Sequence, residues 1–304
     1  MEIFRVTILG CGSALPTNRH LGSSQLIEIR NKAFIVDCSE AFQLQLRRCG
    51  MNFQRIEHIF ISHLHGDHCF GLMGFISTIG LLGRTKPLHI YGPEGISSIF
   101  RPQIDYFCPG LEYEVVFHDL DTQQHKLIYE DRSLTVHTLP LNHRISCCGY
   151  LFREKVGLRH ILPDAILRYG IPRSQINNIK NGMDFMMADG SVIPNSLLTT
   201  PPTRSRSYAY CSDTRYKPSL SQYLEGADAL YHEATYCEDC KDLAQRYYHS
   251  TALEAAQMAK SSNVGKLIIG HYSSRYTNEE VLLDEARSLF DNTILAKELV
   301  QIDV

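Results

Sequence analysis

The segment Ser62-His63-Leu64-His65-Gly66-Asp67-His68 constrains this chain more than any other feature of its sequence. It directly follows Ile56–Ile61, a β-branched and aromatic run that predicts a buried strand. Imidazoles that alternate in an extended stretch point to the same side, so His63 and His65 can share one metal ion. Asp67 and His68 follow the turn expected at Gly66 and can bind a second ion. The segment therefore predicts a strand end that carries a two-metal centre, rather than a loop of solvated histidines.

The ligand types limit the choice of metal and of chemistry. Imidazole nitrogen together with carboxylate oxygen suits zinc, with manganese or another divalent ion as the alternative. Two such ions roughly 3.5–4 Å apart lower the pKa of a water and neutralise charge on a phosphoryl group. We therefore predict a dinuclear metal-dependent hydrolase whose remaining ligands lie elsewhere in the chain.

Those remaining ligands are expected at the ends of other strands, where open α/β sheets place their sites. Four residues have this position after a predicted strand, and each alone would more often be a surface or capped residue: His143, Asp213, His232 and His271. A carboxylate such as Asp213 is the natural bridge between two cations, because it has two oxygens. The other histidines lack this context and stay unassigned.

Strands and helices alternate along most of the chain, which predicts an α/β fold in which the two halves are alike in type. The expected strands are Val6–Leu9, Gln25–Glu28, Ala33–Val36, Ile56–Ile61, Leu88–Tyr91, Tyr113–Phe117, Lys126–Tyr129, Ser133–Leu141, Tyr150–Arg153, Ser207–Cys211, Ala229–Tyr231 and Lys266–Ile269. The expected helices are Ala41–Cys49, Leu72–Leu82, Ile96–Phe107, Ser219–Glu225, Thr251–Ser261 and Asn278–Phe290.

Residues 154–206 interrupt this pattern, because they are polar, basic and rich in Gly and Pro. A short helix is expected at Asp164–Tyr169, and a hairpin at Met186–Val192 with Asp189-Gly190 in its turn. We interpret the segment as an insertion that leaves the regular core of the fold. Its basic side chains, with a second cluster at 204–217, fit either a phosphate-binding patch or an ordinary solvated surface.

Composition limits the setting of the protein. The formal net charge of −3 excludes a polycation, although a local basic patch can still bind nucleic acid. Ten cysteines in a long chain without a secretory signal indicate a reducing, cytoplasmic environment. The lone Cys237-Glu238-Asp239-Cys240 cannot by itself close a zinc site. The sequence offers no apolar run long enough to cross a membrane.

At this point the motifs identify a resemblance. The sequence resembles the ribonuclease Z family, tRNA 3′-processing endonucleases of the metallo-β-lactamase fold, along nearly its whole length. The resemblance rests on these motifs: His63–His68, Gly71-Leu72, Asp213-Thr214-Arg215, His232-Glu233-Ala234-Thr235, His249-Ser250-Thr251 and His271-Tyr272-Ser273-Ser274-Arg275-Tyr276. The resemblance implies a four-layer αββα sandwich over residues 1–304, with an inserted flexible arm at 154–206 that clamps the tRNA. It also implies a homodimer.

The resemblance further implies roles for individual residues. His63, His65 and His143 would hold one metal ion, and Asp67, His68 and His271 the other, with Asp213 bridging the two. Asp67 would also be the general base. Glu233, rather than His232, would face the site and act with His249 near the leaving group. Three further residues could contact substrate phosphate or simply begin a helix: Ser273, Ser274 and Arg275.

Together with the metal motif, the resemblance implies an endoribonuclease with two zinc ions per chain that removes the 3′ trailer of precursor tRNA. It would leave a 3′-hydroxyl on the tRNA and a 5′-phosphate on the trailer. The alternatives are a small-molecule phosphodiesterase or lactamase-like hydrolase, and a non-catalytic RNA-binding relative. The missing secretion signal argues against a secreted lactamase, the basic excursion against a purely small substrate, and the complete ligand set against a degenerate site.

Overall fold

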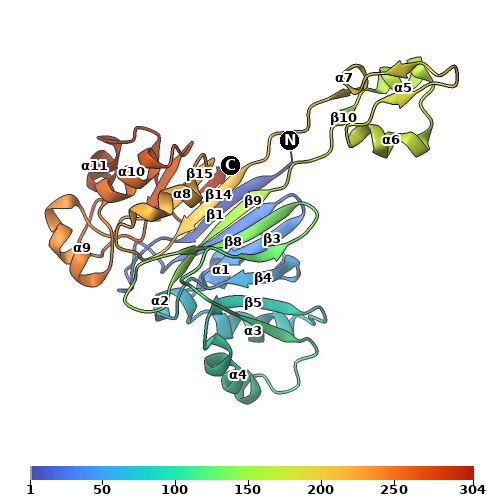
Figure 1. Ribbon diagram of the computed structural model, residues 1–304. Helices are drawn as coiled ribbons and strands as arrows, with labels where there is room; N and C mark the ends of the chain where they lie inside the picture. Colours follow the sequence, from blue (N-terminus) through green and yellow to red (C-terminus); the bar gives the residue numbers. More distant parts are fainter. Residues whose placement is uncertain (1) are drawn as a thin grey trace. The chain divides into compact units, whose positions relative to one another are not determined.

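The computed structural model describes residues 2–304, which divide into two compact units (Figure 1). The larger unit comprises the chain up to Tyr129, Val136–Phe152 and Ser207–Val304, and the smaller unit comprises Glu130–Thr135 and Arg153–Arg206. Within the described residues, no helix is both long and apolar enough to cross a bilayer.

The first sheet of the larger unit has seven strands, and the strands on one side of it are parallel. β3, β4, β5 and β6 run parallel to one another, while β18, β1, β2 and β3 are joined by antiparallel pairing. The order is β18 (Gln301–Asp303), β1 (Phe4–Gly10), β2 (Ser24–Ile29), β3 (Lys32–Val36), β4 (Ile56–Phe60), β5 (Leu88–Pro93) and β6 (Val115–Leu120).

The second sheet also has seven strands, and β14 to β17 are parallel. Its order is β17 (Thr293–Leu295), β16 (Leu267–Gly270), β15 (Ala229–Glu233), β14 (Ser207–Cys211), β9 (Cys148–Glu154), β8 (Leu134–Pro140) and β7 (Leu127–Glu130). The strands β14, β15 and β16 are buried at every position, so their sequences lack the alternation of apolar and polar residues that a strand with one solvated face shows.

Aromatic side chains join the two sheets face to face. Phe152 of β9 packs against Phe34 and Phe60 of the first sheet, with ring centroids 5.8 and 5.5 Å apart. The Tyr150 hydroxyl donates to the Ile61 carbonyl at 2.6 Å, so its polar atom is satisfied within the core. The inner faces of both sheets therefore form one continuous layer of apolar packing.

Helices cover the outer faces of both sheets. α1 (Phe42–Arg48), α3 (Leu72–Leu81) and α4 (Ile96–Phe107) share an apolar core with the first sheet. α10 (Ala252–Ser261) and α11 (Glu280–Arg287) pack by β15–β17, and Thr251 caps α10 through a capping box with Glu254. The arrangement is the predicted αββα sandwich, which confirms the expected fold class (Figure 1).

The smaller unit has its own apolar core of Ala165, Ile171, Ile179, Phe185 and Leu198. These residues come from three short helices, one strand and the turn after the first helix. The elements are β10 (His160–Ile161), α5 (Pro163–Tyr169), α6 (Arg173–Lys180), β11 (Phe185–Met186), β12 (Val192–Ile193), α7 (Asn195–Leu198) and β13 (Thr199–Thr200). The predicted helix and the predicted hairpin are both confirmed.

Several elements were not expected from the sequence. α6 and α9 (Lys241–Tyr247) are short and largely polar, and the edge strands β17 and β18 have only three residues each, so the apolar periodicity of all four is weak. The turn expected at Gly66 is instead the start of the helical turn α2 (Gly66–Cys69). α11 ends at Arg287 rather than at Phe290.

Candidate active site

The residues at the carboxyl ends of several parallel strands lie close together in the structure. Asp37 follows β3, Asp213 comes two residues after β14, Glu233 ends β15, and His271 directly follows β16. The carboxyl ends of the parallel strands β14, β15 and β16 share one edge of the second sheet, so Asp213, Glu233 and His271 meet there. Asp37 comes from the first sheet and reaches the site through its contact with His68. The loops after β4 and β8 add the histidines of the 63–68 segment and His143.

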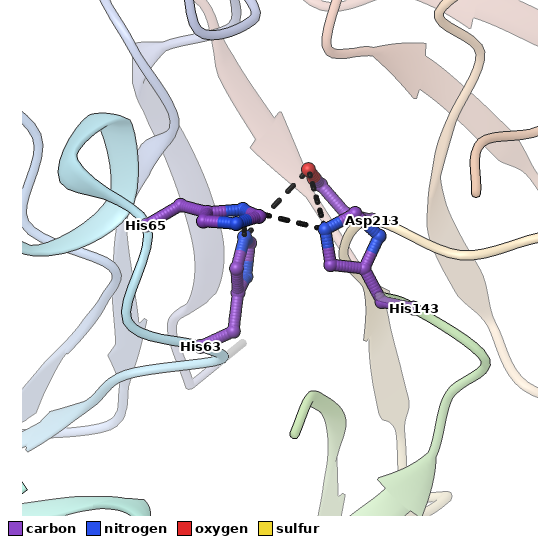
Figure 2. Close-up of side chains that lie close together, drawn as sticks. All are labelled: His63, His65, His143 and Asp213. Atoms are coloured by element: carbon purple, nitrogen blue, oxygen red, sulfur yellow. Dashed lines mark hydrogen bonds and ion pairs between the residues drawn. The ribbon is translucent and has the colours of Figure 1, made fainter. Parts of the chain in front are cut away.

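A first cluster of ligand atoms consists of His63, His65, His143 and Asp213 (Figure 2). His65 Nδ1 lies 3.0 Å from His63 Nε2 and 3.3 Å from His143 Nε2. Asp213 Oδ2 lies 3.7 Å from His63 Nε2 and 3.9 Å from His143 Nε2. Three imidazole nitrogens and one carboxylate oxygen thus converge at the spacing of a four-ligand site.

A second cluster adjoins the first and uses the other oxygen of the same aspartate. Asp213 Oδ1 lies 3.1 Å from His271 Nε2 and 3.4 Å from His68 Nε2. Asp67 Oδ2 lies 3.3 Å from His68 Nε2 and 3.6 Å from His271 Nε2. The structure therefore brings together all seven residues predicted as ligands, with Asp213 between the two clusters.

The donor set fits two divalent cations. Four of the converging atoms are buried and have no hydrogen-bond partner within the described residues: Asp67 Oδ2, His68 Nε2, Asp213 Oδ1 and His271 Nε2. Such unpartnered buried polar atoms are costly unless something else binds them. Burial also lowers the pKa values of His63, His65 and His143, which keeps these rings neutral with a free lone pair.

A further set of polar groups orients the ligands. Asp37 Oδ2 accepts hydrogen bonds from His68 Nδ1, the Ser62 hydroxyl and the Tyr210 hydroxyl, each at 2.8 Å. His143 Nδ1 donates to the Tyr248 carbonyl at 3.0 Å. Such contacts fix which ring nitrogen faces a metal and how the ring is turned. Sequence reasoning missed Asp37, although its position after a predicted strand is the same signal that pointed to Asp213.

Three residues at this site adopt backbone conformations that L-residues seldom adopt. Asp37, Tyr248 and His271 have φ values of 58°, 62° and 64°. Each such conformation costs on the order of 1–2 kcal/mol for a non-glycine residue. The surrounding packing holds them in these conformations. Asp37 and Tyr248 orient predicted ligands, and His271 is itself a predicted ligand. The strain is thus concentrated where side-chain direction matters most.

Glu233 and His249 form a buried pair beside the second cluster. His249 Nδ1 lies 2.8 Å from Glu233 Oε1, while the Thr235 hydroxyl donates to Glu233 Oε2 at 2.7 Å. Burial disfavours the charged ring, but the adjacent Glu233 carboxylate outweighs it and raises the pKa of His249 to about 9. The ring therefore favours the imidazolium form, with Nδ1 engaged by Glu233 and Nε2 available.

The strand-end histidine His232 turns elsewhere. It is fully buried, and its Nδ1 donates to the carbonyl of Glu233 at 2.7 Å. Neighbouring residues on a strand point to opposite faces, so the placement of Glu233 in the site excludes His232 from it. The prediction that His232 is a candidate ligand was therefore wrong, because its neighbour Glu233 faces the site instead.

A cleft of about 770 Å³ opens over both clusters, and Ser273, Ser274, Tyr236 and His249 are among its lining residues. Arg275, predicted with the two serines, is turned away: it donates to Cys240 Sγ at 3.1 Å and its guanidinium carbon lies 5.3 Å from the centre of the Tyr236 ring. These residues form an irregular loop and not a helix start, because α11 begins only at Glu280.

The chain is similar to proteins of known sequence family and structure. Residues 4–104 match the family model described as Anti-Pycsar protein Apyc1. Two solved structures have a TM-score of 0.71: the short form of human tRNase Z, 24% identical over 98% of each chain, and YhfI of Bacillus subtilis, a metallo-β-lactamase fold protein, 19% identical over 100% of each. At this identity they support the fold alone.

Sequence relatives are much closer. The chain is 52% identical to Ribonuclease Z of Bacteroides fragilis strain YCH46, over 98% of both proteins. It is 51% identical to Ribonuclease Z of Bacteroides thetaiotaomicron, over 100% of this chain and 96% of that protein. The resemblance expected from the motifs is thereby confirmed, and the chain belongs to the ribonuclease Z family of the metallo-β-lactamase fold.

Proposed function

We propose that the chain is a zinc-dependent endoribonuclease that removes the 3′ trailer of precursor tRNA. One observation carries this proposal: two adjoining ligand clusters share Asp213 beside the Glu233–His249 pair, in a chain similar over its full length to proteins named Ribonuclease Z. The combination of two cations with a buried proton donor suits cleavage of a phosphodiester whose leaving group is poor.

His63, His65 and His143 would hold one ion, Asp67, His68 and His271 the other, and Asp213 both. When bound, divalent ions supply a more acidic water and stabilise negative charge on the phosphoryl oxygens. The nitrogen-rich first cluster favours zinc, while the two carboxylates at the second cluster also suit manganese. Asp67, whose Oδ2 faces the second cluster, would orient the attacking water and accept its proton.

His249 would complete the reaction on the leaving-group side. Glu233 holds the ring through Nδ1 and favours its protonated form, so a proton at Nε2 is available for the departing 3′ oxygen. Thr235 fixes Glu233 in turn through Oε2. The products expected from this division of roles are a tRNA 3′-hydroxyl and a trailer 5′-phosphate.

Polar and aromatic groups in the cleft would position the RNA. Ser273 and Ser274 offer hydroxyls to phosphate oxygens. Phe70 and Tyr247 also line the cleft and are 67% and 47% exposed, which suits stacking against unpaired bases. Arg144, next to the predicted ligand His143, is an exposed cation of the cleft, and within residues 2–304 its guanidinium makes no hydrogen bond or ion pair.

We expect Arg144→Ala to raise KM for precursor tRNA about tenfold, because a phosphate contact by a cation is lost. Arg275→Ala is the matched control, since that guanidinium is already engaged by Tyr236 and Cys240, and its effect on KM should be smaller. Steady-state kinetics at two salt concentrations would measure both. A larger rise in KM for Arg275→Ala than for Arg144→Ala would show that Arg275 contacts the phosphate, as expected from the sequence.

The inserted unit would bind the tRNA body. It presents exposed guanidinium groups over a small core of its own, and recognition of folded RNA depends largely on shape and phosphate contacts. The exposed arginines of this unit are Arg132, Arg153, Arg168, Arg173 and Arg204. Within this unit the Glu154 amide donates to the Arg206 carbonyl at 2.9 Å, so the two ends of the insertion meet as paired strands.

Replacing residues 156–204 with a tight Asn-Gly turn should therefore leave the catalytic unit folded. We expect KM for precursor tRNA to rise about tenfold to a hundredfold, because several phosphate contacts disappear, while cleavage of a small chromogenic phosphodiester continues. The two substrates would be assayed side by side, with thermal denaturation as the check on folding. Equal loss of both activities in a folded protein would make the insertion part of the catalytic machinery.

The same two substrates test the proposed function itself. A purified protein that cuts a 3′-extended precursor tRNA, loses the activity to a chelator and recovers it with zinc would support the proposal. A protein that hydrolyses only the small diester would be a small-molecule phosphodiesterase. Two bound metals with neither activity would indicate a non-catalytic relative. We also propose a homodimer in which the partner's arm binds the tRNA, which light scattering with and without tRNA would test.

A further inference from the structure

A third cluster of ligand-type side chains lies outside the two clusters of the active site. Cys11 directly follows β1, His20 lies in the loop between β1 and β2, and Glu298 follows β17. Cys11 is buried, and the side chains of His20 and Glu298 are 13% and 17% exposed. None of the three belongs to the seven predicted ligands.

The three donor atoms lie as close together as those of the active site. Cys11 Sγ is 3.4 Å from His20 Nδ1 and 3.6 Å from Glu298 Oε1, and His20 Nδ1 is 3.2 Å from the same Glu298 Oε1. In a tetrahedral zinc site, bond lengths of about 2.0–2.1 Å to nitrogen or oxygen and about 2.3 Å to sulfur place the ligand atoms roughly 3.3–3.6 Å apart. The two edges at sulfur lie within this range, and the nitrogen–oxygen edge is slightly shorter.

The surroundings also resemble a ligand site. His20 Nε2, on the far side of the ring, lies 3.2 Å from Glu279 Oε1, which is the carboxylate–histidine arrangement that orients metal-bound imidazoles. The Leu21 amide donates to Glu298 Oε1 at 3.0 Å and fixes that carboxylate. A neutral thiol buried against a carboxylate gains little, whereas a thiolate and a carboxylate both gain from a shared cation.

We propose that Cys11, His20 and Glu298 bind a third divalent ion of the zinc type, with a structural role. Sulfur, nitrogen and oxygen donors together suit zinc or cobalt better than magnesium or calcium. The ion would fix the loop of residues 13–21, whose Thr17 and His20 line the cleft, to the last strand connection of the chain. With three protein ligands instead of four, it should exchange more readily than the ions of the active site.

The competing explanation is a network of hydrogen bonds without metal. In it a protonated His20 bridges Glu279 and Glu298, and Cys11 donates to the Ala296 carbonyl, 3.4 Å from Sγ. Sulfur separates the two explanations, because the seven ligands of the active site include no cysteine. A thiolate bound to Co²⁺ gives a near-ultraviolet charge-transfer absorption, which imidazole and carboxylate ligands do not give.

The test is to load the protein with Co²⁺, record this absorption and count metal per chain. We expect about three equivalents and a sulfur band in the unaltered protein. Cys11→Ser should lose the band and one equivalent, and Glu298→Gln should lose the equivalent without removing the buried thiol. Cys237→Ser with Cys240→Ser is the control and should keep both.

Two results would overturn the site: no sulfur band in the unaltered protein, or a band that survives Cys11→Ser. Should Cys11→Ser fail to fold, the spectrum of the unaltered protein and the metal count of Glu298→Gln still decide. The sulfur band does not depend on turnover. A failure of the proposed ribonuclease activity would therefore leave this inference standing, and the reverse also holds.

Discussion

Asp213→Asn is expected to abolish turnover of precursor tRNA and to lower bound metal in the active site from two equivalents to fewer than one. Asp213 Oδ2 faces His63 and His143, while Oδ1 faces His68 and His271, so one carboxylate serves both clusters. The neighbouring imidazoles overcome its burial and hold its pKa well below the usual range, so the native group is an anion.

The amide keeps the size of this side chain but removes its charge and one oxygen. Loss of even an orienting contact typically weakens metal binding about 10–100-fold, so loss of a shared ligand should reduce kcat by more than about 10³-fold. Metal analysis and single-turnover cleavage would measure the two effects. Asp291→Asn is the matched control, since Asp291 is exposed and its carboxylate makes no hydrogen bond or ion pair within the described residues. Two retained metals with normal turnover would show that Asp213 does not bridge.

His249→Ala is expected to lower kcat for precursor tRNA by about 10²–10⁴-fold, the range typical for loss of a general acid or base. Metal content and KM should change little, because the ring is held by Glu233 and Thr235 rather than by the ligand clusters. Glu233→Gln should give a smaller loss of kcat in the same direction, since the ring then lacks the carboxylate that favours its protonated form.

The leaving group gives the decisive control for His249. A p-nitrophenyl phosphodiester releases an anion that needs no proton, so His249→Ala should cleave it nearly as fast as the unaltered enzyme does. Equal losses with both substrates would argue against proton donation to the leaving oxygen. Since the ring also lies within ligand distance of Asp213 and His271, a marked loss of bound metal would instead make His249 a ligand.

Much of the site could be predicted because its residues are tied to strand ends. His63, Asp213 and His271 each follow a strand that the sequence predicts, and the strands before Asp213 and His271 are buried at every position, so each strand fixes the position of the ligand after it. The same rule placed His232 in the site wrongly, because a strand end does not say which of two neighbouring residues faces the cleft. Asp37 obeys the rule and was overlooked.

Other features depend on contacts that no local pattern carries. Arg275 was expected to meet phosphate, but Tyr236 and Cys240, which come from a distant loop, engage its guanidinium. The helix α6 has only Ile176 and Ile179 as apolar residues. They stabilise it by packing in the small core of the smaller unit, which the local sequence does not reveal. Cys11 and Glu298 meet across 287 positions of sequence, and no motif links them.

The chemical groups at the ends of the two product fragments report how the RNA is cut. A 3′-extended precursor tRNA would be incubated with the purified protein, with and without a chelator, and both fragments mapped at the nucleotide level. Attack by water with departure of the 3′ oxygen predicts one cut at the trailer boundary, a 3′-hydroxyl on the tRNA and a 5′-phosphate on the trailer, all lost with the chelator. A 2′,3′-cyclic phosphate would contradict attack by water, and cleavage that the chelator does not affect would contradict the need for bound metal.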